Sequence, residues 1–172
     1  SHSIQHAQRI IDRNYEIISG ECCLMNAQLD KTLDAVKCVG MESVVGASDL
    51  TFEHVLQARK RIAPYVHNTP ILTSSYLNDR IGAELFFKCE NFQKAGAFKV
   101  RGACNAVFGL SDEDARRGVA THSSGNHALS LSYAAGRRGI PCHVVMPRTA
   151  PQAKKDAVIG YGGLITECEP ST

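Results

Sequence analysis

Hydrophobic and polar positions follow a repeating pattern from Thr51 to the carboxyl terminus. Short apolar runs bounded by Pro, Gly or charged residues predict strands. Between them lie segments whose apolar positions are three or four residues apart, and these predict helices that end at Gly or Pro. The predicted strands are residues 71–72, 84–89, 119–122, 143–146 and 164–168, and the predicted helices are residues 51–62, 75–81, 98–110, 125–138 and 151–159.

This alternation predicts an α/β fold with an open parallel sheet covered by helices, because parallel strands need crossover connections that are usually helical. No internal repeat or low-complexity tract interrupts the pattern. Ligands of such folds bind at the carboxyl ends of the strands, where the following helices present free N–H groups. We therefore expect the chemistry of this chain in the turns that follow its strands.

Residues 1–48 follow a different pattern, and we interpret them as an amino-terminal extension of unknown role that precedes a patterned region at residues 49–172. An isoleucine stripe predicts one short helix that ends at Gly20. Its members are Ile4, Ile10, Ile11, Ile17 and Ile18. Because the strong pattern begins only after Met41, we expect the first forty residues to lie upstream of the natural start.

The composition is that of a folded globular protein. The chain has 172 residues and 18.7 kDa, with 44% hydrophobic and 21% charged residues, which disfavours collagen-like, coiled-coil and disordered chains. The formal net charge of +2 offers no broad basic surface for nucleic acid or an anionic membrane. No apolar run approaches the roughly 18–20 residues that span a bilayer. We therefore expect a small-molecule ligand.

Seven cysteines are scattered along a chain that is long enough to fold without disulfide bonds, and their odd number favours free thiols. This favours a reducing compartment, and we predict a cytoplasmic protein. The spacing of zinc sites is missing, so we predict no metal centre. The thiols are expected to be small core residues. They are Cys22, Cys23, Cys38, Cys89, Cys104, Cys142 and Cys168.

The turn after the third predicted strand concentrates polar groups. Ser123, Ser124, Asn126 and His127 bring two hydroxyls, an amide and an imidazole to the start of a helix, where backbone N–H groups are free. Such a cradle suits a carboxylate or a phosphate. The alternative is structural, since either serine could simply cap the helix.

A lysine stands at the start of another predicted helix, within residues 94–103. Lys99 lies between Phe98 and Val100, and Arg101 provides a second cation two residues away. A desolvated lysine near another cation is the type that attacks carbonyl carbons to form Schiff bases. The alternative is a solvated surface charge, which is the commoner role of lysine.

Two segments together resemble the serine racemase and serine/threonine dehydratase family. Residues 88–103 contain the sequence Phe-Lys-Val-Arg-Gly-Ala around Lys99, and residues 123–127 read Ser-Ser-Gly-Asn-His. Both motifs in this order are far more specific than either alone. The family uses pyridoxal phosphate on the tryptophan-synthase-β-like fold, called fold type II, so the resemblance implies the amino-terminal half of that fold. Further similar segments are residues 69–75 and 146–154.

The resemblance implies a role for each residue of the two motifs. Lys99 would hold the cofactor as a Schiff base and remove the substrate Cα proton, with Phe98 packed beside the cofactor. Asn126 would hydrogen-bond the ring hydroxyl of the cofactor, whose ring accepts the electrons that remain at Cα. The carboxylate of the substrate would be bound by Ser123, Ser124, Asn126 and His127.

Ser124 bears on the choice of reaction. Threonine dehydratases that resemble this chain usually have Ala at this position, whereas serine racemases have Ser. A hydroxyl on the face opposite Lys99 can return a proton to Cα from the other side and so invert the centre. The same intermediate can instead lose a β-hydroxyl, so one site can serve both reactions. A related 3-hydroxyaspartate dehydratase shares the motif, and this region of the sequence does not separate the two activities.

Other parts of the family pattern follow the matched segment. They are the glycine-rich loop for the cofactor phosphate, the serine that faces the ring nitrogen and the acidic ligands of Mg²⁺. Nucleotide contacts would come from Ser74, Ser75 and Lys94, but Ala95 and Leu129 differ from the animal serine racemases, which argues against activation by ATP.

The resemblance thus implies a racemase with ammonia-lyase activity towards serine, threonine or a similar hydroxy amino acid. At full length it would be a homodimer, and the fragment alone would be inactive. Two alternatives stay open. One is a threonine or 3-hydroxyaspartate dehydratase, and the other is a non-catalytic protein, either a truncated product or a fragment that pairs with a full-length subunit. A nucleotide-binding Rossmann module is disfavoured because GxGxxG is absent after the first strand.

Overall fold

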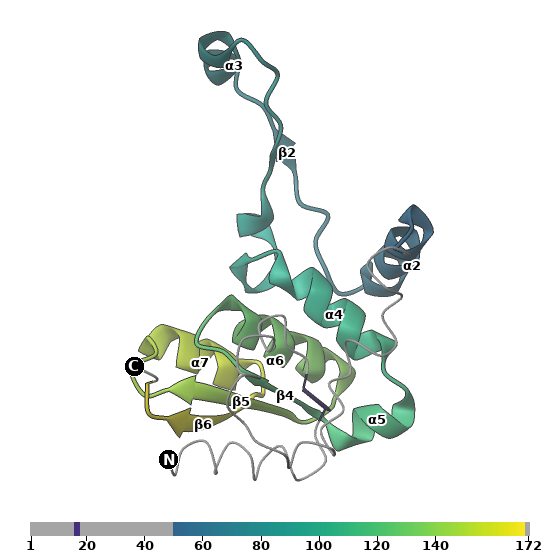
Figure 1. The fold of residues 1–172 in the computed structure, drawn as a ribbon, viewed down its shortest axis with the longest axis vertical. Coiled ribbons are helices and arrows are strands. Elements are labelled where there is room, and N and C mark those ends of the chain that lie inside the picture. The colour runs from purple at the N-terminus through teal and green to yellow at the C-terminus, as the bar shows by residue number, and fades with distance from the viewer. Residues whose placement is uncertain (1–15, 18–49, 171–172) are drawn as a thin grey trace.

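The computed structural model describes residues 16–17 and 50–170 (Figure 1). Four parallel strands form its main sheet in the order β1-β4-β5-β6. In the register of the sheet, His122 lies opposite Val145 and Pro147 lies opposite Cys168, so β4, β5 and β6 end at one edge. The predicted parallel sheet is therefore confirmed. The strands are β1 (Glu16–Ile17), β4 (Val119–His122), β5 (Cys142–Pro147) and β6 (Leu164–Cys168).

The helices are layered around α6 (Asn126–Arg138), which contacts β4 and β5. Helix α4 (Lys99–Gly109) packs on α6, and α2 (Phe52–Ile62) packs on α4 (Figure 1). Helix α7 (Gln152–Gly160) contacts both α6 and β6. Each of these helices lies within one residue of its predicted bounds. No helix in the described part of the chain is both long and apolar enough to cross a membrane.

Helix α5 (Asp112–Arg117) was not expected. Ser111 caps it, because its hydroxyl accepts a hydrogen bond from the Asp114 N–H at 3.1 Å. Acidic residues fill its first turn and basic residues its last turn, which complements the helix dipole. These signals are local and visible in the sequence, but six residues are too few to show a helical repeat of apolar positions.

The core lies where α6 meets the sheet and α4. Small side chains on α6 let the three layers approach closely, and its one large buried residue is Leu131. A Cβ atom on Gly136 would lie 2.5 Å from the Tyr161 carbonyl oxygen, so this helix position has no room for a side chain. Other core residues are Val100, Cys104, Val107, Val119, Ala128, Ala134, Ala135, Cys142, Val144, Met146 and Val158.

Two predicted strands do not belong to the parallel sheet. Strands β2 (Ile71–Leu72) and β3 (Phe87–Lys88) pair antiparallel in a separate ribbon, and the expected strand at 84–89 is only two residues long. Helix α3 (Ser75–Ile81), whose bounds match the prediction, lies at the far end of this ribbon (Figure 1). We call residues 70–89 the arm. The prediction that these two strands join the parallel sheet was wrong because an alternation of strands and helices does not specify which strands pair.

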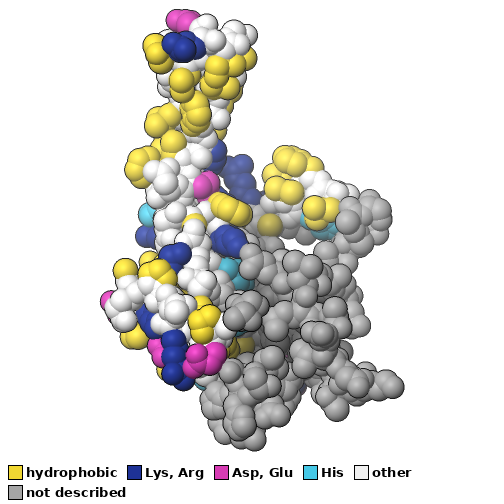
Figure 2. Space-filling model, turned by 60° about the vertical axis from the view of Figure 1, so that its left-hand side comes forward, with side chains coloured by type: hydrophobic (Ala, Val, Ile, Leu, Met, Phe, Trp, Pro, Cys, Tyr) yellow, Lys and Arg dark blue, Asp and Glu magenta, His cyan; other side chains and the backbone are white. Residues whose placement is uncertain are grey.

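The arm exposes large apolar side chains, which gather on it in the space-filling view (Figure 2). Phe86 is 67% exposed and Ile71 is 59% exposed. Such a dense apolar surface is unusual for a monomeric soluble protein and is typical of a contact region. The exposed members are Ile71, Leu72, Tyr76, Ile81, Phe86 and Phe87.

The isoleucine-rich helix predicted near the amino terminus is wrong at Glu16–Ile17, which form strand β1. Glu16 pairs with Val119 and Ile17 with Ala120, so β1 covers the edge of β4. An open sheet edge provides unpaired N–H and C=O groups, and this tertiary pairing outweighs the local helical pattern. The rest of that predicted helix lies outside the described residues, as do Cys22, Cys23 and Cys38.

Candidate active site

Lys99 is the first residue of α4 and is half-buried. Val100 beside it is fully buried and anchors this turn in the core, whereas Phe98 is 63% exposed. The N–H of Arg101 donates to the Phe98 carbonyl at 3.0 Å, so the helical turn already includes Phe98. Lys99 therefore stands on a helical backbone at the margin of the core.

The backbone just before Lys99 is unusual. Ala95 has φ 56° and Gly96 has φ 64°, two successive residues in the left-handed region. A non-glycine residue in this region carries strain that persists only when its surroundings fix the backbone. The turn of residues 94–96 also contacts α6, so it connects the start of α4 with the helix that follows the serine-rich turn.

Arg101 does not act on Lys99 as an uncompensated cation. Its Nε donates to Glu90 Oε2 at 2.8 Å, and one terminal nitrogen donates to Glu90 Oε1 at 2.7 Å. The hydrogen bonds from Arg101 hold the pKa of Glu90 at about 2, although burial opposes them, and the Thr69 hydroxyl supports them. The sequence-based expectation that Arg101 activates Lys99 by its charge is therefore not supported.

The serine-rich turn continues β4 directly into α6. The Ser123 N–H donates to the Val145 carbonyl at 3.1 Å and extends the sheet by one bond. The Ser123 hydroxyl accepts from the Gly125 N–H at 3.2 Å, which is a local turn and not the helix cap considered for the serines. Gly125 occupies the cap position of α6, and no side chain in the described part of the chain caps it. Asn126 and Ser124 are exposed.

Lys154 on α7 also reaches this turn. A Cβ atom built on Gly125 would lie 3.6 Å from Lys154 Nζ. The start of a helix is already electropositive, so an ammonium group placed there favours an anion between the two. No local pattern in the sequence assigned Lys154 to the site. Its only signal was membership of the similar segment 146–154, because α7 and the turn are far apart in the chain.

Packing brings the two motifs to the same part of the molecule. Helices α4 and α6 pack along each other, and the turn before Lys99 contacts α6. Both helices also begin on the same side of the fold (Figure 1). The lysine and the serine-rich turn thus come from separate segments of the chain and lie at the starts of two helices that pack on each other.

The three residues expected to contact a nucleotide are not brought together by the described part of the chain. Ser74 caps α3 at the end of the arm, where its hydroxyl accepts from the Leu77 N–H at 3.4 Å. Ser75 is the exposed first residue of α3. Lys94 lies in the short turn of residues 94–96 that precedes α4. A shared nucleotide site on this chain remains a prediction that the arrangement does not favour.

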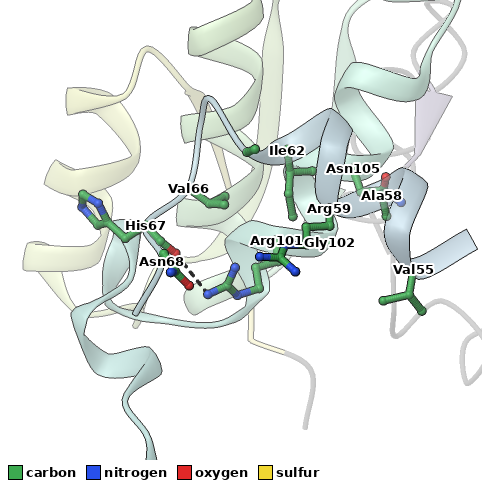
Figure 3. Close-up of a pocket in the computed structure, with 11 residues that line it drawn as sticks. Val55, Ala58, Arg59, Ile62, Val66, His67, Asn68, Arg101, Gly102 and Asn105 are labelled. Carbon is green, nitrogen blue, oxygen red and sulfur yellow. Dashed lines mark hydrogen bonds between the residues drawn. The ribbon is translucent and has the colours of Figure 1, made fainter. Parts of the chain in front are cut away.

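A cavity of about 520 Å³ lies elsewhere, between α2 and α4 (Figure 3). Its walls are mostly apolar, with Val55 and Ile62 from α2, and Gly102 and Asn105 from α4. Arg101 reaches its rim and donates to the His67 carbonyl at 3.2 Å. Neither Lys99 nor the serine-rich turn lines this cavity, so we do not assign the chemistry to it.

Two thiols are confirmed as core residues. Cys104 and Cys142 are buried, and burial raises the pKa of each to about 11, so neither is a reactive thiolate at neutral pH. Within residues 50–170, no three His, Cys, Asp or Glu side chains gather as a possible metal-binding group.

The chain is similar to known proteins in both sequence and structure. Residues 62–172 match the family described as pyridoxal-phosphate dependent enzyme. The chain is 72% identical to the β-hydroxyaspartate dehydratase of Paracoccus denitrificans over 122 residues, which are 71% of this chain and 39% of that protein. It is 52% identical to the serine racemase of Dictyostelium discoideum over 120 residues, which are 70% of this chain and 37% of that protein.

Solved structures give the same relationship. The structure of maize serine racemase superposes with a TM-score of 0.67 at 53% identity, over 69% of this chain and 36% of that one. A threonine deaminase from tomato (Solanum lycopersicum) superposes with a TM-score of 0.65 at 33% identity, over 70% of this chain and 35% of that one. The chain therefore spans less than half the length of these relatives. With its parallel sheet and its Lys99 and Ser-Ser-Gly-Asn-His motifs, it belongs to the pyridoxal-phosphate dependent enzyme family of fold type II.

Proposed function

We propose that this chain is the amino-terminal portion of a pyridoxal-phosphate enzyme that racemises and dehydrates serine or a similar hydroxy amino acid. The observation that carries the proposal is the packing of α4 on α6, which brings Lys99 to the same end of the fold as the serine-rich turn. An amine for the cofactor and an anion cradle for the substrate are the two groups that this chemistry needs from the protein.

The described residues fit the cofactor. Lys99 would bind its aldehyde carbon, and the exposed ring of Phe98 would give the neighbouring surface an aromatic wall. Asn126 is exposed at the start of α6, where its amide would donate to the ring hydroxyl. When bound, the cofactor supplies an electron sink for the bond that breaks at Cα. The protein orients that bond and moves the protons.

The substrate carboxylate would be held at the start of α6. The first turn of α6 and the exposed hydroxyl of Ser124 would provide donors, and Lys154 adds a positive charge. Gly125 leaves space for the carboxylate because it has no side chain. Asn126, His127 and Ser123 complete the set that the motif implies.

With the substrate held, Lys99 removes the Cα proton on one face. The Ser124 hydroxyl then delivers a proton on the opposite face, which inverts the centre. Loss of the β-hydroxyl as water, in place of that protonation, gives dehydration. We therefore assign Lys99 and Ser124 as the two proton carriers, and the balance between the two reactions depends on Ser124.

A second candidate function is dehydration of 3-hydroxyaspartate. The identity of 72% to the β-hydroxyaspartate dehydratase favours it, and the charge of Lys154 beside the turn suits a substrate with two carboxylates. Measuring kcat/KM of the complete gene product for serine, threonine and 3-hydroxyaspartate separates the candidates. A preference for the dicarboxylate above about tenfold would favour this alternative, since a charged pair contributes about that much discrimination or more.

Absorbance tests the proposed role of Lys99 directly. We expect the complete gene product to develop a visible band on addition of pyridoxal phosphate, because the amine and the aldehyde form a conjugated imine. Lys99→Ala should abolish the band, whereas Lys60→Ala, a change of an exposed lysine on α2, should retain it. A band that survives Lys99→Ala would refute the assignment.

We further propose that the complete enzyme is a homodimer in the cytoplasm. The buried free thiols Cys104 and Cys142 support a reducing compartment. The exposed apolar arm supports an assembly larger than this chain. The division into an extension at residues 1–48 and a catalytic portion at 49–172 stays a prediction, as does a non-catalytic role for the chain on its own.

A further inference from the structure

Both ends of the arm meet α4 at one cluster of polar side chains, which we call the root clamp and define as Thr69, Glu90, Gln93 and Arg101. Arg101 binds both carboxylate oxygens of Glu90, at 2.7 and 2.8 Å. The Thr69 hydroxyl donates to Glu90 Oε1 at 2.5 Å. Three segments, residues 67–69, 90–93 and the first turn of α4, are thereby joined at one carboxylate.

Gln93 makes a second connection within the clamp. Its amide oxygen accepts from the N–H groups of His67 at 2.8 Å and Lys94 at 2.9 Å, and its amide nitrogen donates to the His67 carbonyl at 2.8 Å. Gln93 and Thr69 are each only 4% exposed. Gln93 thus binds the backbone of a distant segment as a neighbouring strand would.

The clamp encloses the segment that carries Lys99. Gln93 fixes the chain before the left-handed pair Ala95 and Gly96, and Arg101 fixes it two residues after Lys99. A strained turn of this kind needs constraints on both sides. The planar, two-point contact between a guanidinium and a carboxylate also fixes orientation, which a single charge would not do.

We propose that the root clamp positions Lys99, with Glu90 and Gln93 setting the direction from which its amine reaches the cofactor aldehyde. The inference rests on the proposed role of Lys99 as the cofactor-binding lysine. The clamp residues are positioning residues that act through the backbone. Apolar side chains in place of a partly buried ion pair often stabilise a fold as well, because desolvation offsets attraction, so stability alone is a weak reason for choosing this arrangement.

Site-resolved trapping on the full 172-residue chain tests the proposal. The amine of a lysine condenses with the aldehyde of pyridoxal phosphate and releases water, and borohydride then adds hydride to the C=N bond and fixes the adduct. Peptide mass spectrometry gives the share of adduct at each lysine. We expect Lys99 to carry the largest share in the parent chain. Glu90→Gln keeps the shape of the side chain but removes its charge. It should lower that share about tenfold, because even a small misplacement of a reacting group slows a reaction by a factor of this size or more.

Two comparisons make the result specific. Lys60, exposed on α2, serves as an internal reference whose labelling should not change. Glu113→Gln is the matched control, because it breaks the exposed pair of Glu113 with Arg117 on α5 at 3.4 Å, far from the clamp. Thr69→Val removes only the hydroxyl donor to Glu90 and decides the question if Glu90→Gln does not fold; it should lower the Lys99 share in the same direction.

The outcomes are distinct. A parent chain in which Lys99 is not the favoured lysine contradicts the proposed function itself, and the role of the clamp with it. Favoured labelling of Lys99 that is unchanged in the folded clamp variants leaves the proposed function intact and overturns the positioning role. A loss at Lys99 in the clamp variants but not in Glu113→Gln, with unchanged labelling of Lys60, supports both.

Discussion

Ser123 and Ser124 are neighbours in the chain, yet the fold gives them different surroundings. The Ser123 hydroxyl accepts a backbone hydrogen bond from Gly125 at 3.2 Å and is half-buried. Ser124 is exposed, and its hydroxyl bonds to no other residue in the described part of the chain. A hydroxyl already held by the backbone is less able to carry a proton than one that faces the site. This exposure is our reason for proposing Ser124, and not Ser123, as the proton carrier.

Substitution of Ser124 tests this difference. In the complete gene product, we expect Ser124→Ala to lower formation of D-serine about a hundredfold, the lower end of the range for loss of a positioned acid, and to spare pyruvate formation. Ser123→Ala should instead lower both products together, because it loosens the turn. Paired assays of both products from L-serine provide the measurement. Equal losses of the two products in Ser124→Ala would rule out its role as the acid.

Glu90 makes the stability of the chain depend on pH. Its pKa falls from 4.5 to about 2 on folding, through the hydrogen bonds from Arg101. A lowered pKa stabilises the folded state above pH 4.5, and this contribution disappears as the pH falls towards 2. The difference in unfolding free energy between the parent and Glu90→Gln should therefore be largest above pH 5 and should shrink below it. Urea titrations at several pH values measure this, and a difference that is constant with pH would exclude the ion pair as its cause.

At the scale of elements, close approach of α6 to its neighbours depends on small residues. A Cβ atom on Gly136 would meet the Tyr161 carbonyl oxygen at 2.5 Å, and a Cβ atom on Gly163 would meet Ser132 Oγ at the same distance. A side chain at either glycine would therefore push α6 away from its neighbours and disturb the core around Leu131.

Two glycine substitutions test this packing. Gly136→Ala should destabilise the fold by about 1–3 kcal/mol, the usual cost of overpacking. Gly102→Ala on α4 is the matched control, since its new Cβ would have no described atom within 4 Å apart from its chain neighbours and the backbone of its own helix. It should stabilise the chain by about 0.5–1 kcal/mol, because alanine is the better helix former. Thermal unfolding of both variants gives the comparison, and equal shifts would contradict the packing argument.

At the scale of the whole molecule, the arm is a region where several large apolar side chains are exposed to solvent. A two-stranded ribbon is only marginally stable by itself. In this ribbon, large apolar side chains such as those of Phe86 and Ile71 are exposed. The chain spans 39% of the length of the β-hydroxyaspartate dehydratase. We therefore expect the isolated chain to bury these side chains by self-association.

Light scattering on the isolated chain tests this expectation. Replacing Ile71 and Phe86 together by lysine should reduce the concentration-dependent increase in mass, because it removes exposed apolar surface and adds charge. Asp79→Lys, at an exposed position on α3, changes the charge of the arm but not its apolar surface, and should leave the association unchanged. Equal reduction by both changes would assign the association to charge.

The elements predicted most accurately are those whose ends are marked by neighbouring residues in the chain. Helix α3 has the expected bounds because Ser74 caps its start and Gly82, with φ 69°, ends it. The bounds of β4 were also correct, because Gly118 precedes its apolar run and the polar residues 123–127 follow it. The strand expected at 84–89 shrank to Phe87–Lys88, and Glu16–Ile17 became a strand, because both outcomes depend on pairing with distant residues.

The sequence by itself determined the candidate chemistry. The motifs around Lys99 and at residues 123–127 identified the family, because each motif is a run of neighbouring residues that can be recognised without knowing the fold. The tertiary structure decided which groups meet. It paired Arg101 with Glu90, brought Lys154 to Gly125 and detached β2 and β3 from the sheet. These contacts join residues far apart in the chain, and a pattern of local apolar and polar positions does not encode which distant partner a side chain will reach.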